Sequence, residues 1–305
     1  MKVLLPTLDQ MMFLFLCMLI GFLLNRGKVL SEDADVVLSR LENYVFIPAL
    51  TINSFMTYCT AENLAENAGA LGYSLLFLGI SIAIATLLAP RFTGDRGEVG
   101  IYRYSLSVTN MGFMGNSLVQ GLLGDAALFR YLIFTLPMNT FVYTAGVIWL
   151  TAGKRKFSWR MLVNPMFISV IAGVALGLTK CPLPSFVGKT IGACASCFSP
   201  LAMVITGFVI AKFDFGSLLR RGRIYILTGI RLVAMPLLYL LIAALLRMPG
   251  DARVSMLIAS AMPLGLNSIV FPAAYGGDET IGASMAVISN LVGILTVPLI
   301  VGLVL

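Results

Sequence analysis

The sequence lacks histidine altogether and contains few charged residues. Aspartate, glutamate, lysine and arginine make up 11% of its 305 residues, against about a quarter in soluble domains. We find no acidic residue at the centre of an apolar stretch, so the side chains that usually act as acid, base or metal ligand are missing there. These absences argue against a membrane-embedded enzyme, and we expect neither a metal ion nor a bound cofactor.

Cysteine is also scarce, and its distribution argues against a disulfide framework. The five cysteines are odd in number and scattered through apolar segments. Cys194 and Cys197 form a CxxC pair, but no second pair of ligands accompanies it, so we expect buried packing. No Walker loop occurs, and therefore no ATP-driven step is evident. Basic cytoplasmic loops explain the net charge of +7 more simply than a nucleic-acid partner, which we do not expect.

Long apolar stretches are what the sequence has in abundance. Hydrophobic residues make up 59% of the chain, and about 20 mostly apolar residues can cross a bilayer as a helix. The first stretch has no small-residue cleavage site, so we interpret it as a retained span and not a signal peptide. In the sixth, Gly173 and Gly177 have the spacing of a close helix–helix contact. The sequence predicts an all-α protein of the lipid bilayer with ten transmembrane helices, at 8–24, 36–57, 69–90, 101–123, 129–152, 163–179, 190–211, 224–246, 253–275 and 281–304.

Positive charge is distributed unevenly between the connections of these stretches. Fourteen lysines and arginines lie in the odd-numbered connections, and six lie in the even-numbered connections and at the termini. The connection from Tyr58 to Asn67 contains Glu62 and Glu66 and no basic residue. Because cytoplasmic loops carry an excess of lysine and arginine, we predict that the odd-numbered connections are cytoplasmic and that both termini lie outside.

The longest polar connection, Gly153 to Arg160, divides the chain almost in half. Five stretches lie on each side, and an odd number per half makes the second half insert upside down relative to the first. The sequence Phe46-Ile47-Pro48 in the second stretch is echoed by Phe198-Ser199-Pro200 in the seventh, at an offset of 152. We therefore predict two inverted five-helix repeats, at residues 1–152 and 153–305.

The fourth and ninth stretches contain helix-breaking residues in their middle. Ala259 to Asp278 includes Pro263, Gly265 and Pro272, each of which weakens a helix interior. Within the glycine-rich segment from Thr109 to Asp125, Asn116-Ser117-Leu118-Val119 precedes Asn267-Ser268-Ile269-Val270 by 151 residues. In a bilayer, freed backbone groups are tolerated only where protein or a water-filled cavity satisfies them. Interrupted segments at matching places in two halves predict the binding site of a secondary transporter.

Amide and hydroxyl side chains near these interruptions are the candidate site residues. We expect Asn116 and Asn267 to lie at the breaks, where half-helix N-termini offer unpaired N–H groups and a partial positive charge that suit an anion. Each amide can donate to a carboxylate or accept from a protonated one; alternatively, these amides only cross-brace helices. The predicted substrate-binding residues are Asn110, Asn116, Ser117, Pro263, Asn267 and Ser268, and those that could further line the site are Pro48, Asn53, Asn139, Pro200, Arg231 and Asn290.

Some of these further residues have a second interpretation. Arg231 lies about eight residues into the eighth predicted helix. It could balance an anionic substrate or extend to the cytoplasmic interface near Arg223, and we favour the second alternative. Pro48 and Pro200 should kink the second and seventh helices, and such kinks are common in membrane helices without a binding role.

The chain combines ten stretches in two sets of five with the segment NMGFMGNSL in the fourth stretch and AMPLGLNSIVFPAAYG in the ninth. This combination resembles the auxin efflux carrier family. That family includes plant auxin exporters and bacterial permeases for malate and other carboxylates, and the likeness covers nearly the whole chain. It implies an elevator in which helices one, two, six and seven form a scaffold, often a dimer interface, and the other six form a transport domain. It also implies that the substrate carboxylate binds where helices four and nine cross, near Asn116, Asn267 and Asn110. The short central connection favours a compact prokaryotic permease of the plasma (inner) membrane.

Two functions remain as alternatives. The first is a secondary active transporter of a small organic anion, such as a malate- or auxin-like carboxylate. The second is a sodium-coupled carrier of a neutral or cationic solute, with sodium bound by unwound carbonyls at the breaks, because neutral amides allow both. The coupling ion, H⁺ or Na⁺, stays open.

Overall fold

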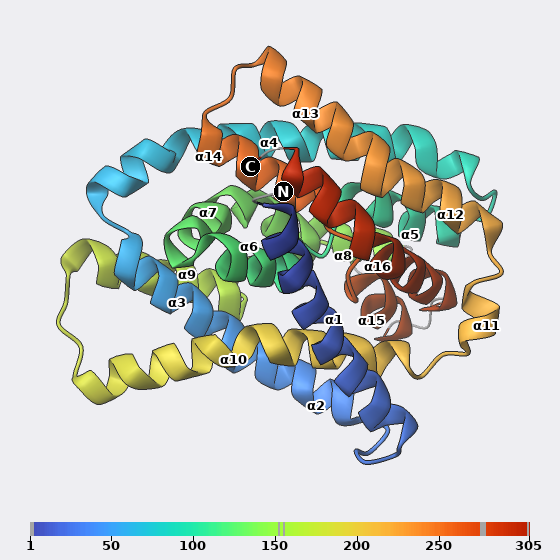
Figure 1. The fold of residues 1–305 in the computed structure, drawn as a ribbon, viewed down its shortest axis with the longest axis horizontal. Coiled ribbons are helices and arrows are strands. Elements are labelled where there is room, and N and C mark those ends of the chain that lie inside the picture. Colours follow the sequence, from blue (N-terminus) through green and yellow to red (C-terminus); the bar gives the residue numbers. More distant parts are fainter. Residues whose placement is uncertain (1–2, 152, 155, 275–278, 304) are drawn as a thin grey trace.

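Every regular element in the computed structural model is a helix within the residues that it describes, which are 3–151, 153–154, 156–274, 279–303 and 305. The predicted all-α class is therefore confirmed. Figure 1 shows long helices that cross one another at several angles, with the two labelled chain ends close together in the view. The predicted repeat boundary at 152 and the end of the ninth predicted helix at 275 lie outside the described residues.

The first half of the chain contains α1 to α8. α1 (Leu4–Arg26) is uninterrupted, whereas α2 (Ala34–Leu41) continues through a π-helical turn (Glu42–Phe46) into α3 (Ile47–Tyr58). α4 (Ala61–Leu88) ends in a 3₁₀ turn (Ala89–Arg91). The other helices of this half are α5 (Arg96–Ser107), α6 (Asn116–Leu123) after the π-helical turn Met111–Gly115, and α7 (Asp125–Phe141), which continues through the π-helical turn Val142–Gly146 into α8 (Val147–Leu150).

The second half contains α9 to α16. A 3₁₀ turn (Trp159–Leu162) precedes α9 (Pro165–Thr179), and the long α10 (Ser185–Ile210) and short α11 (Phe215–Leu218) follow. α12 (Gly222–Gly229) continues through the π-helical turn Ile230–Ala234 into α13 (Met235–Leu245). The last helices are α14 (Gly250–Ala261), α15 (Asn267–Ala274) and α16 (Glu279–Gly302).

Capping side chains explain where several helices begin. The Thr60 hydroxyl accepts a hydrogen bond from the backbone N–H of Asn63 at the start of α4, and the Asn164 side chain accepts one from Phe167 at the start of α9. These oxygens satisfy N–H groups of the first turn, which have no partner inside the helix. These two helix starts are thus encoded locally, in single capping residues.

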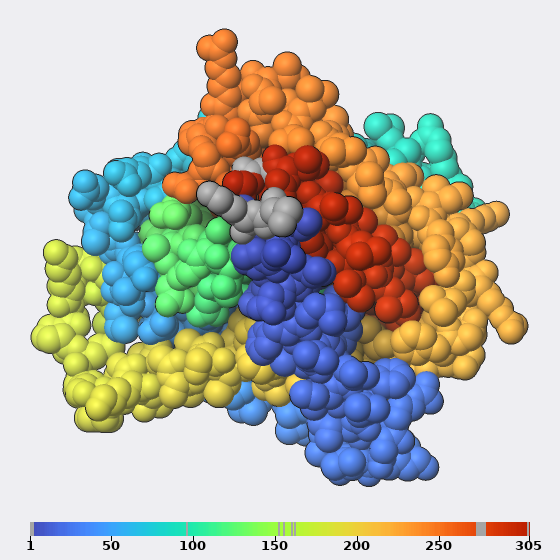
Figure 2. Space-filling view, viewed as in Figure 1, coloured from blue at the N-terminus to red at the C-terminus, as the bar shows by residue number. Residues whose placement is uncertain are grey.

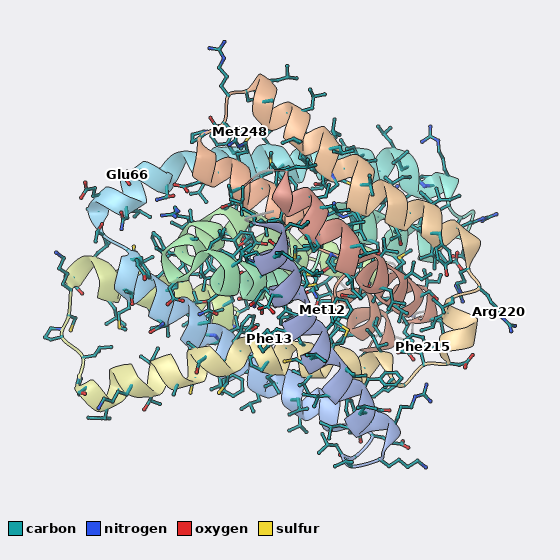
Figure 3. All side chains as sticks on the ribbon, viewed as in Figure 1. Met12, Phe13, Glu66, Phe215, Arg220 and Met248 are labelled. Carbon is teal, nitrogen blue, oxygen red and sulfur yellow. The ribbon has the colours of Figure 1, made fainter. Side chains whose placement is uncertain are left out.

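Several helices have the length and composition of membrane spans. In the described part of the chain six segments qualify by these criteria, and α9 is a shorter apolar helix. Large apolar side chains are exposed on their outer faces, such as Met12 and Phe13 on α1 (Figure 3). Such exposure fits a lipid-facing surface, since lipid tails are as apolar as these side chains. The six segments are Leu4–Arg26, Ala61–Arg91, Asp125–Leu150, Ser185–Ile210, Gly222–Leu245 and Glu279–Gly302.

Glycines allow two pairs of helices to pack backbone against backbone. A Cβ atom at Gly207 of α10 would overlap the carbonyl of Met18 on α1, which crosses α10 there. On α9, Cβ atoms at Gly173 and Gly177 would lie 2.7 Å from the Cβ and 2.6 Å from the carbonyl oxygen of Phe55 on α3. The close helix contact predicted from the Gly173–Gly177 spacing is therefore confirmed.

Figure 2 shows α1 at the front of the molecule, between the green segment of α6 and α7 and the red α16.

Candidate functional site

The first predicted interruption is present, but it lies earlier than expected. α5 ends at Ser107, and Val108 has extended backbone angles (φ −118°, ψ 139°). Val108 and Thr109 are both β-branched, and such residues favour extended backbone over helix. Asn110, and not Asn116, therefore lies at the break. Asn116 is the first residue of α6, with helical φ and ψ of −58° and −44°, which corrects its expected position.

The second interruption lies where the prolines and glycines predict it. α14 ends at Ala261, and Met262 adopts φ −64° and ψ 141°, the conformation expected of a residue that precedes proline. Pro263 has no N–H group to continue the helix. The chain then becomes helical again at Asn267, the first residue of α15.

The two interruptions contact each other. The backbone N–H of Asn110 donates a hydrogen bond of 2.8 Å to the carbonyl of Pro263. The Thr109 hydroxyl donates one of 2.8 Å to the carbonyl of Ala259. A Cβ atom at Gly265 would lie 3.2 Å from Oδ1 of Asn110, so only glycine keeps this contact relaxed. Residues about 150 positions apart thus form one unit in the interior.

A cavity of about 480 Å³ borders this unit. Its wall is formed on one side by α2, α3 and the start of α9, and on the other by the two interruptions and α7. Asn267 donates a hydrogen bond of 3.0 Å from Nδ2 to the hydroxyl of Tyr104 at this wall. Among its described lining residues, the amide, hydroxyl and phenol side chains from α5, α7, the π-helical turn that follows α7, and the two interruptions with the helices that follow them are Tyr104, Thr109, Asn110, Asn116, Asn139, Tyr143 and Asn267.

Four of the predicted site residues therefore line one cavity, namely Asn110, Asn116, Asn139 and Asn267. Ser117 and Ser268 are buried, and their hydroxyls donate to carbonyls of their own segments, Phe113 and Gly265. Asn290 donates from Nδ2 to the carbonyl of Leu264, so it braces the second interruption. The predicted residues that do not appear in the described lining are Pro48, Asn53, Ser117, Pro200, Arg231, Pro263, Ser268 and Asn290.

Two amide atoms at this site have no partner. The Nδ2 atom of Asn110 and the Oδ1 atom of Asn116 are buried and form no hydrogen bond with any described residue. Buried polar atoms are nearly always hydrogen-bonded in proteins. One unpaired donor and one unpaired acceptor at the same cavity therefore indicate a polar solute or water as their partner.

Arg231 does not extend to the interface, contrary to the alternative that we favoured. Its side chain is 0% exposed, and its Nη1 atom contacts the sulfur of Met235 at 3.6 Å. Nε and Nη2 have no hydrogen-bond partner among the described residues. The π-helical turn that contains Arg231 packs against α14 and α16, which hold the second interruption between them, so burial follows from the helix packing.

Glu42 is a buried acidic residue that the sequence analysis overlooked. It lies inside the second predicted helix, is 0% exposed, and both carboxylate oxygens are without a partner in the described part of the chain. Its position near the start of an apolar stretch could have revealed it. Tyr104 and Tyr143 were also missed, because tyrosine in an apolar helix gives no signal that separates core packing from cavity lining.

Charged residues of the cavity gather at one end. Asp35 and Arg40 of α2 line it there, and Asp35 accepts a bond of 2.7 Å from Lys212. Toward the opposite end, Phe55 of α3 and Phe129 of α7 contact edge to face, with ring centroids 5.2 Å apart. This aromatic pair is buried and does not line the cavity; it lies one helical turn beyond the lining residues Thr51 and Leu132.

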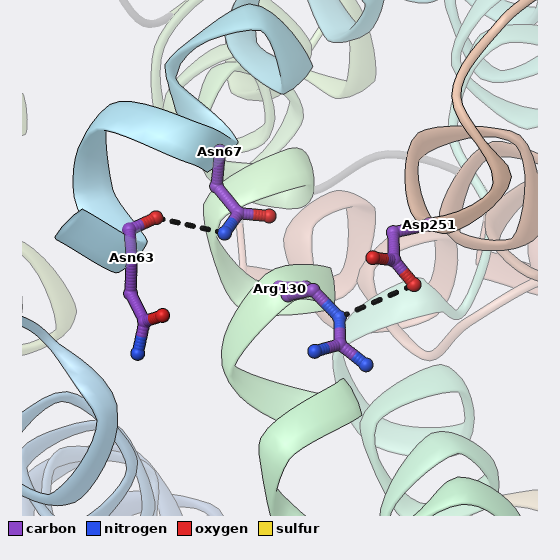
Figure 4. Close-up of polar contacts among 4 residues, drawn as sticks. All are labelled: Asn63, Asn67, Arg130 and Asp251. Carbon is purple, nitrogen blue, oxygen red and sulfur yellow. Dashed lines mark hydrogen bonds and ion pairs between the residues drawn. The ribbon is translucent and has the colours of Figure 1, made fainter.

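A second, smaller hollow of about 180 Å³ lies beyond the aromatic pair. Phe129 and Tyr58 line it, and their ring centroids lie 6.3 Å apart. Figure 4 shows its polar rim, where Arg130 forms an ion pair of 3.4 Å with Asp251. Both side chains are partly exposed, so this pair contributes little stability. The two hollows are thus aligned along the contact between α3 and α7, with one aromatic layer between them.

Comparisons with known proteins identify the family of the chain. The family model described as "Membrane transport protein" matches residues 6–155 and 150–301. A protein of Methanothermobacter thermautotrophicus described as an uncharacterized transporter is 22% identical over 297 residues, which cover 95% of this chain and 96% of that protein. The chain is therefore a multi-pass membrane transporter and not an enzyme. It belongs to the membrane transport protein family, which is the auxin efflux carrier family that its motifs resemble.

Proposed function

We propose that this protein is a secondary active transporter of a small organic anion, a malate- or auxin-like carboxylate, which binds where the two interruptions meet. The observation that carries the proposal is the cavity at the junction of Asn110 and Pro263, whose described lining includes the four predicted asparagines Asn110, Asn116, Asn139 and Asn267. Amide N–H groups there can donate to a carboxylate, and the unpaired Nδ2 of Asn110 is one such donor.

The electrostatics of the surroundings favour an anion. The π-helical turn that leads into α6 begins beside the cavity, as does α15, and a helix N-terminus carries a partial positive charge. Arg231 is buried against the helices that hold the second interruption, and its guanidinium cannot lose its proton under physiological conditions. It therefore adds positive potential without contacting the solute. In the described lining, the acidic residue Asp35 is already paired with Lys212.

The proposed arrangement has ten transmembrane helices in two inverted five-helix repeats, 1–152 and 153–305. The two matches of the family model meet at residues 150–155, at the central connection. Glu66 and Arg220 lie at opposite sides of the molecule in Figure 3, which fits an outer acidic loop and a basic cytoplasmic one. We place the protein in the plasma membrane with both termini outside.

An elevator mechanism fits the position of the cavity. It lies between α2, α3, α9 and α10, which belong with α1 to the proposed scaffold, and the two interruptions, which belong to the proposed transport domain. The cavity extends to Asp35 and Arg40, the proposed cytoplasmic end, and the buried pair of Phe55 and Phe129 lies one turn beyond its lining residues on α3 and α7. This is an inward-facing arrangement. Exposed apolar residues on α2 and α9, such as Val37 and Ile171, leave a scaffold face that a second copy could cover.

A sodium-coupled carrier of a neutral or cationic solute is the second candidate. The unpaired Oδ1 of Asn116 favours it, since oxygen atoms bind cations and ammonium groups. Under the first candidate, either H⁺ or Na⁺ could couple transport.

Counterflow in proteoliposomes tests the proposal. Liposomes loaded with unlabelled malate, or with each member of a panel of mono- and dicarboxylates, should take up the same labelled carboxylate faster than protein-free liposomes. A parallel series uses amino acids with and without a sodium gradient. Exchange of at least one carboxylate supports the proposal. Sodium-dependent uptake of a neutral or cationic solute, with no carboxylate exchange, would instead establish the second candidate.

A further inference from the structure

The backbone at the second interruption leaves a carbonyl without its helical partner. In a helix the carbonyl of Ala259 would accept from the N–H of residue 263, but Pro263 has none. Ala259 is 0% exposed, so water cannot readily reach this carbonyl. An unpaired buried carbonyl is costly, about 1–3 kcal/mol.

Thr109 supplies the missing donor from the other interrupted segment. Its hydroxyl donates to the Ala259 carbonyl over 2.8 Å, and the side chain itself is buried. Other buried threonines behave differently: the hydroxyls of Thr135 and Thr206 donate to carbonyls of their own helices. The Thr109 hydroxyl therefore links two segments and does not bond within its own segment.

Ser289 of α16 forms a hydrogen bond with Leu264, the residue that follows Pro263 in the same interruption. Its hydroxyl accepts from the backbone N–H of Leu264 over 3.0 Å while it donates to Ala286 of its own helix. Leu264 is buried, and this N–H would otherwise lack a partner. The last turn of α14 and the chain that follows it are thus each held by a hydroxyl from another segment, Thr109 in the first case and Ser289 in the second.

These bonds surround the residues that we place in the solute site. Asn110 follows Thr109 directly, and its own N–H donates to Pro263. Asn267 lies three residues after Leu264 and begins α15. A shift at either hydroxyl would change the distance between the two asparagines. We propose that Thr109 and Ser289 are positioning residues, which set solute affinity by holding the two interruptions in register. Thr109 borders the cavity, but its hydroxyl proton is donated to the Ala259 carbonyl and not to the solute.

This inference rests on the proposed function for its affinity readout, so the experiment has two independent readouts. The first is hydrogen–deuterium exchange, followed by mass spectrometry, of peptides that cover residues 259–270 in the full-length protein. The second is the half-saturation concentration for labelled malate in counterflow. The variants are Thr109→Val, which keeps the shape and removes the hydroxyl, Thr109→Ser, which restores it, and Ser289→Ala. Thr135→Val is the matched control, since it removes a buried hydroxyl that bonds only within α7.

We expect Thr109→Val and Ser289→Ala to speed exchange in 259–270 and to raise the half-saturation concentration about tenfold. Thr109→Ser should stay within about threefold of the unmodified protein, and Thr135→Val should leave both readouts unchanged. The inference is overturned if hydrogen–deuterium exchange of residues 259–270 is unaltered in Thr109→Val and Ser289→Ala. It is also overturned if Thr135→Val changes that exchange in the same way. If the unmodified protein shows no malate counterflow, the proposed function loses support for that solute. The comparison of hydrogen–deuterium exchange still decides the positioning role. Should Thr109→Val not fold, Ser289→Ala and Thr109→Ser carry the same comparison.

Discussion

The side-chain amide of Asn267 donates a hydrogen bond of 3.0 Å to the hydroxyl of Tyr104. Asn267 is the first residue after one interruption, and Tyr104 lies in the last turn of the helix that precedes the other. The bond therefore joins the two segments at the cavity wall. It occupies one N–H of the amide and leaves its second N–H and its oxygen for a solute.

Replacing Asn267 by alanine should lower carboxylate counterflow at least tenfold, since a hydrogen bond to a charged group contributes about 1.5–3 kcal/mol. Tyr104→Phe should have a smaller effect, because it removes only the partner of the amide. Size-exclusion chromatography and thermal melting control for folding. Unchanged counterflow in Asn267→Ala would remove this residue from the site.

Replacing Phe129 by alanine should open a path between the two hollows. Phe129 and Phe55 form the layer between them, and truncation leaves a cavity in a packed contact. We expect a raised passive leak of labelled malate out of proteoliposomes in the absence of counter-solute. Phe186→Ala on α10, which removes a 72% exposed ring, is the control. A leak equal in both variants contradicts the proposed seal.

Arg231 should affect transport and stability in opposite directions. Arg231→Met removes a buried unpaired charge with a side chain of similar length, so the melting temperature should stay the same or rise. Counterflow of carboxylates should fall, because positive potential behind the site is lost. Arg231→Lys keeps the charge and should retain more transport. A methionine variant that transports at the original rate would show that Arg231 has no electrostatic role.

The crossing of α1 and α10 should tolerate no side chain at Gly207. A Cβ atom there would overlap the Met18 carbonyl, whereas one at Gly192 of the same helix meets nothing within 4 Å. We expect Gly207→Ala to destabilise the protein by about 1–3 kcal/mol and Gly192→Ala to stabilise it by about 0.5–1 kcal/mol. Melting temperatures in one detergent measure both. Equal melting temperatures would mean that the crossing is looser than described.

Single cysteines should report the proposed orientation. In a cysteine-free background, Glu62→Cys should react with a membrane-impermeant maleimide in intact cells, and Lys156→Cys only after permeabilisation. Both positions are exposed, so access to the reagent depends on the side of the membrane. The reverse pattern overturns the orientation inferred from the basic residues.

Composition and local pattern were enough for the class of protein and for the existence of two interruptions. Apolar stretches predict helices because a bilayer leaves the backbone no other partner. Pro263 breaks its helix whatever surrounds it, and therefore the second interruption lies where the sequence predicts. The same holds for the contact at Gly173 and Gly177, which depends on the absence of side chains.

The sequence by itself therefore determined the all-α class, the family and the polar residues that could form a site. Only the tertiary structure decided that Asn110 and not Asn116 lies at the first break, that Arg231 is buried, and that Tyr104 meets Asn267. The physical reason is that these outcomes depend on partners far away in the chain. Val108 and Thr109 can leave the helix because the Ala259 carbonyl accepts from the Thr109 hydroxyl and the Pro263 carbonyl accepts from the N–H of Asn110. No local pattern records such a partner.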